Sequence, residues 1–301
     1  MLHPQARAAV EAYAHEPKVY AQGYDVADAR EAARRAAAGQ PREAVAEVRD
    51  LDAAGVPCRL YRPEGSLPGV VVHLHGGGFV FNDVEVHDAA VRRLANRLGH
   101  AVLSVDYRRP PEHRFPAAPD DVSTVLAWLA AHGDAEGLGG PVAAHGDSAG
   151  GNLALVAALR HPGALVGLAL TYPYLDPECA GASHRTAADG FDEAEARWYW
   201  EQYAASEEDL RHPDLAPLRS ESLHTLPPTL VTTAEHDPLR DEGELLVTRL
   251  AEAGVAVTGT RYLGQVHGYW RHWDVFDAAA PHTAAIAGFL AEQLRGPRAL
   301  V

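Results

Sequence analysis

HGDSAGGN, residues 145–152, is the stretch that decides the fold. It fits the pattern G-x-S-x-G around Ser148 and lies between a strand-like segment, 141–146, and a helix-like segment, 149–161. The small residues on both sides of the serine allow a sharp, strained turn in which strand and helix approach closely. The pattern therefore predicts that Ser148 stands at the carboxyl end of a parallel sheet, where open α/β sheets place their sites. A helix-capping serine in a glycine-rich turn is the structural alternative.

Apolar strand-like runs alternate with amphipathic helices along the rest of the chain. The expected strands are 44–51, 56–63, 69–75, 101–107, 141–146, 164–173, 229–237 and 255–263. The expected helices between and after them are 86–99, 120–132, 149–161, 241–254 and 282–294. Continuous apolar strands that alternate with helices form parallel sheets covered on both faces. We therefore expect an α/β fold with a mostly parallel, eight-stranded sheet and an antiparallel pair at its start.

Two segments stand outside this alternation. Residues 1–40 are alanine-rich and read as helical, and residues 176–215 are too long for an ordinary crossover loop. We expect them to form a helical cap over a catalytic domain, 41–301, into which about 176–215 is inserted. The cap aromatics either wall a substrate pocket or dock the cap onto the body. They are Trp198, Tyr199, Trp200 and Tyr203.

Composition narrows the classes of partner and compartment. The chain has 301 residues and a net charge of −15, which disfavours nucleic acid and anionic membranes because both need a basic surface. No apolar run is long enough for a membrane span. The start of the chain lacks the apolar segment of a secretory leader, and Cys58 and Cys179 read as free core thiols. The sequence therefore predicts a cytoplasmic protein.

A second glycine-rich block, His75-Gly76-Gly77-Gly78, follows the strand 69–75 directly. Acyl transfer needs hydrogen-bond donors aimed at the oxyanion of a tetrahedral intermediate, and glycines let a loop present bare N–H groups. A phosphate-binding loop is the alternative, but Phe81 breaks the G-x-G-x-x-G pattern and Lys18 is the chain's only lysine.

A serine nucleophile needs a base, and the base needs an acid that orients it. In this fold the chain order is serine, acid, histidine. Asp237 ends the next-to-last expected strand and His267 follows the last one, so they are the expected acid and base. Asp241 is a rival acid that reads better as a first-turn residue of its helix. The remaining histidines considered are His272 and His282, as weaker candidates for the base, and His236, as a bystander.

With these residues in hand, the chain resembles the hormone-sensitive-lipase family of α/β-hydrolases, in its bacterial esterase branch. The resemblance covers about residues 40–295. It rests on five blocks in order: HGGGF (75–79), DYRRPPEHRFPAAPDD (106–121), GDSAGGN (146–152), TAEHDPLRDEGE (233–244) and VHGYW (266–270). Carried over by position, the family's nucleophile, acid and base fall on Ser148, Asp237 and His267. Its oxyanion-hole donors fall on the backbone N–H groups of Gly77, Gly78 and Ala149.

The matching blocks also contain residues that we expect to support the site rather than react. They are His75, Gly76, Asp147, Arg108 and Glu112. The chain departs from the family pattern where Arg109-Pro110 replaces the frequent Leu-Ala and Tyr269 replaces a common Phe. A second histidine, His73, precedes the HGGG block. None of these departures removes a catalytic group.

The resemblance implies a serine carboxylesterase that hydrolyses short- to medium-chain esters through an acyl-enzyme. It implies a small-molecule ester as the partner, no cofactor and no metal. A homodimer is possible. The same residues would serve a hydrolase of amides, formamides or acetylated sugars. A non-catalytic receptor is the alternative from another class: plant gibberellin receptors resemble the family but lack the catalytic histidine, which is present here as His267.

Overall fold

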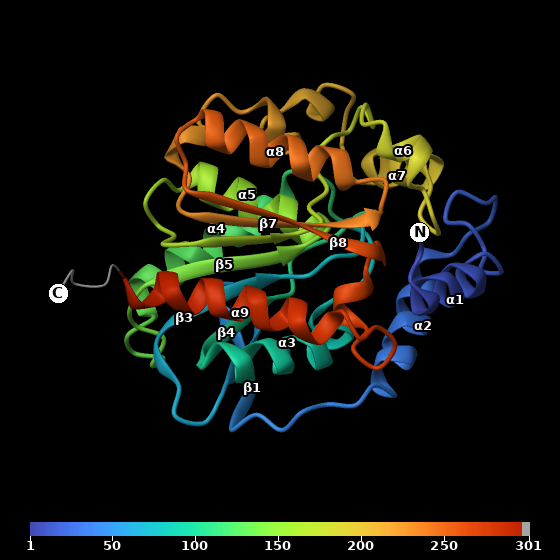
Figure 1. Cartoon of the computed structure of the whole chain (residues 1–301). Helices are drawn as coiled ribbons and strands as arrows, with labels where there is room; N and C mark the ends of the chain where they lie inside the picture. Colours follow the sequence, from blue (N-terminus) through green and yellow to red (C-terminus); the bar gives the residue numbers. More distant parts are fainter. Residues whose placement is uncertain (297–301) are drawn as a thin grey trace.

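The computed structural model describes residues 1–296, which fold around one twisted sheet (Figure 1). The strand order is β1-β2-β4-β3-β5-β6-β7-β8; β2 pairs antiparallel with β1 and β4, and the other neighbours are parallel. The strands are β1 Glu47–Ala53, β2 Val56–Arg62, β3 Leu67–Leu74, β4 His100–Val105, β5 Val142–Asp147, β6 Leu168–Thr171, β7 Thr229–His236 and β8 Val257–Val266. The prediction of a mostly parallel, eight-stranded α/β sheet is confirmed.

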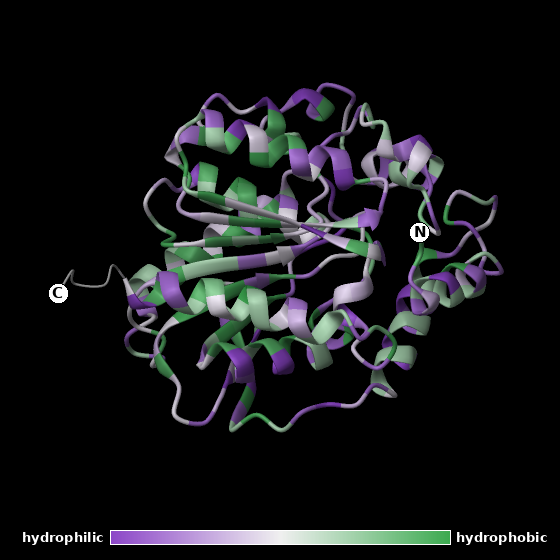
Figure 2. Cartoon of the chain, in the orientation of Figure 1, coloured by the Kyte–Doolittle hydropathy of each residue, from purple (hydrophilic) through white to green (hydrophobic). Residues whose placement is uncertain are grey.

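Helices cover both faces of the sheet (Figure 1). α3 (Val84–Leu98) and α9 (Ala279–Arg295) lie on one face, and α4 (Ala117–His132), α5 (Ala149–Arg160) and α8 (Arg240–Glu252) lie on the other. Figure 2 shows hydrophobic residues gathered along the central strands and on α5. The apolar runs are explained by this layering, since residues such as Val70, Val71 and Val72 on β3 alternate between two buried faces.

Strand ends differ from the sequence expectation in two places that matter for the site. β6 is only four residues long, Leu168–Thr171, whereas the apolar run 164–173 predicted a longer strand. The first residues of that run instead belong to a turn, in which the Ala164 N–H donates to the His161 carbonyl at 3.0 Å. β8 ends at Val266, three residues later than expected, so His267 follows the strand immediately.

The remaining helices lie together beside the carboxyl ends of the strands (Figure 1). α1 (Pro4–Tyr13) and α2 (Val26–Ala38) come from the N-terminal segment, and α6 (Ser183–Thr186) and α7 (Glu193–Tyr203) come from the segment between β6 and β7. The Tyr13 hydroxyl donates to the Glu195 carboxylate at 2.8 Å, and the rings of Tyr24 and Trp198 meet edge to face. The segment between β6 and β7 also holds 3-10 turns at Asp209–Arg211, Pro217–Arg219 and Leu223–Thr225. The division into cap and catalytic domain stays a prediction.

Helix length and polarity bear on membrane insertion. Across residues 1–296, none of the helices has both the length and the apolar composition required to pass through a bilayer.

Candidate active site

Ser148 occupies a tight corner between β5 and α5. Its backbone angles, φ 54° and ψ −121°, are unfavourable for a residue with a side chain, and its N–H donates to the Thr171 carbonyl at 2.9 Å. A Cβ at Gly150 would overlap the Leu74 carbonyl of β3, and one at Gly146 would overlap the Gly150 carbonyl. The Ser148 side chain makes no capping hydrogen bond to α5, which excludes the helix-cap interpretation.

Three side chains from three strand ends meet in one hydrogen-bonded row. His267 Nε2 lies 3.0 Å from Ser148 Oγ, and His267 Nδ1 lies 2.8 Å from Asp237 Oδ2. Asp237 is fully buried, and its other oxygen accepts the Leu239 N–H at 2.8 Å. Because an ionised carboxylate can only accept, Nδ1 carries the imidazole proton and Nε2 is free to accept from the serine hydroxyl.

None of the rival acids and bases takes part in this row. Asp241 accepts the Ser183 N–H at 2.8 Å and pairs with Arg240, and His236 bonds Asp189 at 2.8 Å. His282 is buried between the Tyr269 hydroxyl and Thr232. His272 lines the same cavity as Ser148, but the neighbouring Arg271 and burial lower its pKa to about 3.

The HGGG loop leaves two backbone N–H groups free beside the serine. The Gly76 N–H donates to Asp147 Oδ1 at 2.9 Å, so it is already used. In the part of the chain that the structure describes, the N–H groups of Gly77 and Gly78 donate to no acceptor, and both residues line the cavity with Ser148. The Ala149 N–H, first in α5, likewise has no intrahelical acceptor.

The expected supporting residues hold the loop to different degrees. The His75 ring stacks on Tyr107 at 4.2 Å between centroids, and the Tyr107 hydroxyl donates to the His75 carbonyl at 2.7 Å. Glu112 is exposed and reaches the loop only through Arg30, whose Nε donates to the Val80 carbonyl at 2.9 Å. Arg108 forms an ion pair with Asp121 of α4 at 2.7 Å.

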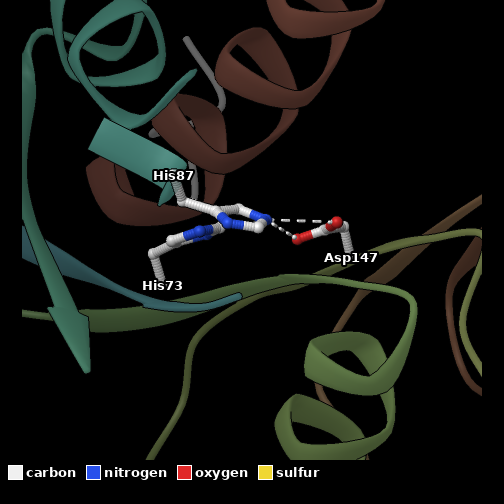
Figure 3. A group of neighbouring side chains, drawn as sticks. All are labelled: His73, His87 and Asp147. Carbon is white, nitrogen blue, oxygen red and sulfur yellow. Dashed lines mark hydrogen bonds and ion pairs between the residues drawn. The ribbon is translucent and has the colours of Figure 1, made fainter. Parts of the chain in front are cut away.

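Beneath the loop lies a fully buried histidine cluster that the sequence analysis did not find (Figure 3). His87 Nε2 approaches the Asp147 carboxylate at 3.2 Å, and His73 Nδ1 lies 3.0 Å from His145 Nδ1. Burial alone would raise the pKa of Asp147, but His87, His73 and His145 outweigh it and hold that pKa below its usual range. His73 and His145 lie on neighbouring expected strands, and the structure pairs them in register. That alignment was the one sequence signal for the cluster, since His87 was marked only by its place on an amphipathic helix.

The same cluster is the group in residues 1–296 whose atoms could ligate a metal. Ligand atoms of His73, His87 and Asp147 all lie within 4.8 Å of one another (Figure 3). Asp147, however, already accepts the Gly76 N–H and faces His87. An ion would have to compete with the contact that holds the HGGG loop, so we interpret the cluster as hydrogen-bonded support.

A cavity of about 410 Å³ opens above Ser148 and His267. The strand ends and HGGG loop form its floor, and α1, α2 and α7 form much of its wall. Of the four cap aromatics, Tyr199 lines the cavity. Trp200 and Tyr203 instead pack into the core, where the Tyr203 ring stacks on Phe79 at 3.8 Å. Both expected uses of these aromatics therefore occur, since Tyr199 lines the cavity and Trp200 and Tyr203 pack in the core.

Comparisons with known proteins show which family the chain resembles in sequence. A family model of the alpha/beta hydrolase fold matches residues 71–271. The carboxylic ester hydrolase LipN of Mycobacterium tuberculosis is 36% identical over 267 residues, which cover 82% of this chain and 71% of that protein. The arylesterase of Saccharolobus solfataricus is 34% identical over 241 residues, or 76% of this chain and 79% of that one.

Solved structures extend the likeness to the whole fold. An α/β hydrolase from the metagenome of Lake Arreo superposes with a TM-score of 0.89 at 32% identity, covering 97% of this chain and 98% of its own. The esterase of Pyrobaculum calidifontis gives 0.86 at 34% identity, covering 97% and 99%. The resemblance inferred from the motifs is confirmed: the chain belongs to the α/β-hydrolase family, in its hormone-sensitive-lipase-like esterase branch, and is a hydrolase.

Proposed function

We propose that the protein is a serine carboxylesterase that works through an acyl-enzyme. The observation that carries this proposal is the row Ser148–His267–Asp237, with distances of 3.0 Å and 2.8 Å between the reacting groups. The ester hydrolase and arylesterase names of the relatives support the ester as substrate.

In the first half of the reaction, His267 Nε2 takes the proton of Ser148 as Oγ attacks the ester carbonyl. Asp237 holds the imidazole in the required tautomer and stabilises the imidazolium. The N–H groups of Gly77, Gly78 and Ala149 receive the oxyanion. As the C–O bond breaks, His267 donates the proton to the leaving alcohol.

In the second half, water takes the place of the alcohol. His267 removes one of its protons while the oxygen attacks the acyl-enzyme, and then returns a proton to Ser148 as the carboxylic acid leaves. His267 accepts and returns every proton in both halves of the reaction, so the chain's own residues are sufficient for the chemistry. The cavity, at about 410 Å³, is of a size that suits short- to medium-chain esters.

A fluorophosphonate tests the assignment of the nucleophile directly, because it phosphonylates an activated serine. We expect one adduct on the wild-type protein, located by mass spectrometry on the peptide that contains Ser148, and none on the Ser148→Ala variant. An unlabelled wild-type protein that still hydrolyses esters would sink the assignment. An unlabelled and inactive protein would favour the receptor alternative.

Amide, formamide and acetyl-sugar hydrolysis use the same groups. Comparing kcat/KM for an ester and its matched amide separates them, and we expect the ester to react faster. We also propose a cytoplasmic location, supported by the buried and unlinked thiols of Cys58 and Cys179. A homodimer stays a prediction that sedimentation equilibrium would test.

A further inference from the structure

The cavity contains an acidic side chain that the hydrolytic steps do not use. Glu195, on α7, lines the same cavity as Ser148 although its residue is only 3% exposed. We propose that Glu195 and the aromatic rings beside it form a subsite for a cationic group, so that the enzyme selects esters that carry an ammonium. This inference rests on the serine-esterase function proposed above.

The side-chain hydrogen bonds of Glu195 all come from tyrosine hydroxyls, which can donate to an ionised carboxylate. The Tyr13 hydroxyl lies 2.8 Å from both carboxylate oxygens, and the Tyr199 hydroxyl lies 3.1 Å from one of them. Each hydroxyl has one proton to donate, and the carboxylate accepts both. Burial raises the pKa of Glu195 above its usual value, and the two tyrosines oppose that shift.

This carboxylate has no counter-ion of its own. Within residues 1–296, Glu195 takes part in no ion pair, and the nearby Lys18 ammonium pairs with Asp192 at 3.5 Å instead. A buried charge without a partner is costly, and a cation that enters the cavity would offset that cost. The subsite is therefore incomplete in a way that a cationic ligand would complete.

Aromatic rings form the rest of the subsite. The faces of Tyr and Phe rings attract cations, and quaternary ammonium groups are bound in aromatic cages of this kind. Phe81 meets Tyr199 edge to face at 5.9 Å, and Phe191 lies 6.1 Å from Tyr199. The Tyr13 ring already faces the Lys18 ammonium, 4.8 Å from its centroid. The other rings that line the cavity on this side are Tyr24, Phe81, Phe191 and Tyr199.

Two contacts connect this subsite to the reacting groups. The Tyr199 ring lies directly against Gly78 of the HGGG loop, where an added Cβ would overlap it. The Phe191 ring lies 5.1 Å from the His267 ring. A substrate whose carbonyl is at Ser148 can therefore place a cationic group beside the aromatic wall only a few bonds away.

The charges around the cavity point the same way. Glu16, Asp147, Asp189 and Glu195 line it, against one arginine among the described residues, Arg271. Asp189 is engaged by His236 at 2.8 Å, and Asp147 by the Gly76 N–H and His87, which leaves Glu195 as the buried acid without an ion-pair partner. An acidic cavity attracts cationic esters and repels anionic ones.

An isosteric pair of inhibitors isolates the charge. Choline and 3,3-dimethylbutan-1-ol have the same shape and differ by a quaternary nitrogen in place of a carbon. Each is tested as an inhibitor of 4-nitrophenyl acetate hydrolysis. This assay does not depend on whether the acyl part or the alcohol part of the natural ester carries the cationic group. We expect choline to inhibit at an inhibition constant about tenfold lower, in line with a desolvated cation–π contact.

The matched variants are Glu195→Gln and, as a control on the exposed side of the same helix, Glu201→Gln. The preference for choline should fall severalfold in Glu195→Gln, because the carboxylate charge is lost while the aromatic rings remain, and should be unchanged in Glu201→Gln. A wild-type enzyme that binds both inhibitors equally, or an undiminished preference in folded Glu195→Gln, overturns the proposal; if that variant does not fold, the wild-type comparison decides. If wild type does not hydrolyse the ester, the proposed function fails, and calorimetric titration with choline still tests the subsite.

Discussion

Asp237 and Asp241 lie close together at the start of α8, yet their side chains serve different partners. Asp237 Oδ2 contacts His267 Nδ1, whereas Asp241 accepts the Ser183 N–H and so ties α6 to α8. Residue type and local spacing do not separate them. The topology does, because only the residue directly after β7 reaches the end of β8, where His267 begins the next loop.

Exchanging each acid for its amide tests this division at single residues. Asp237→Asn should lower kcat by roughly 10⁴-fold, because the amide favours the wrong imidazole tautomer, as it does in the serine-protease triad. Asp241→Asn, the matched control, should change kcat by no more than a few-fold. Steady-state kinetics on one activated ester compares the two, and equal losses in both variants would contradict the assignment.

Sequence signals located the three side chains that meet in the hydrogen-bonded row, because each follows a strand end. Ser148 is marked by G-x-S-x-G, and Asp237 and His267 by the last two strands. His87 and Glu195 carried no such signal, since their roles depend on which segments pack over the loop. His87 comes from the buried face of α3, and Glu195 from a helix whose position beside α1 is set only in three dimensions.

At the scale of the elements, the most consequential arrangement is the HGGG loop held between two neighbours. Asp147, at the end of β5, takes its Gly76 N–H, and Tyr199 of α7 packs against Gly78. The loop therefore contacts both the turn that contains Ser148 and helix α7. A tilt of α7 would move Tyr199 relative to Gly78 and would also move Glu195.

Element boundaries were predictable only where apolar patterning and turn residues agree. The sheet and its helices follow from the alternation of apolar runs. The length of β6 did not, because the apolar residues 164–167 pack in a turn rather than a strand. The 3-10 turns between β6 and β7 were not predicted either, since they have no periodic pattern.

At the scale of the whole molecule, several fully buried imidazoles, among them His73, His75 and His145, couple the stability of the fold to pH. Burial lowers the pKa of His145 to about 4 from 6.5, and burial with His87 and Arg109 lowers that of His75 to about 3. The unfolded chain binds protons at these histidines at higher pH than the folded one. Their contribution to the unfolding free energy is therefore complete above about pH 6.5 and is lost as the pH falls toward 4.

Urea unfolding at pH 7 and pH 4.5 measures this contribution. For His145 it is on the order of 3 kcal/mol at neutral pH. His145→Asn should lose clearly less unfolding free energy between the two pH values than wild type. His224→Asn, at an exposed position, should behave like wild type. The same pH dependence in wild type and His145→Asn would exclude the buried cluster as its cause.

The central claim is that Ser148 is the nucleophile of an ester hydrolase, and single-residue kinetics tests it most directly. Ser148→Ala and a matched control in the core of β4, Ser104→Ala, are compared with wild type on short-chain 4-nitrophenyl esters. We predict that Ser148→Ala lowers kcat by roughly 10⁴-fold or more, while Ser104→Ala stays within a few-fold of wild type. Ester hydrolysis by folded Ser148→Ala at the wild-type rate would contradict the account.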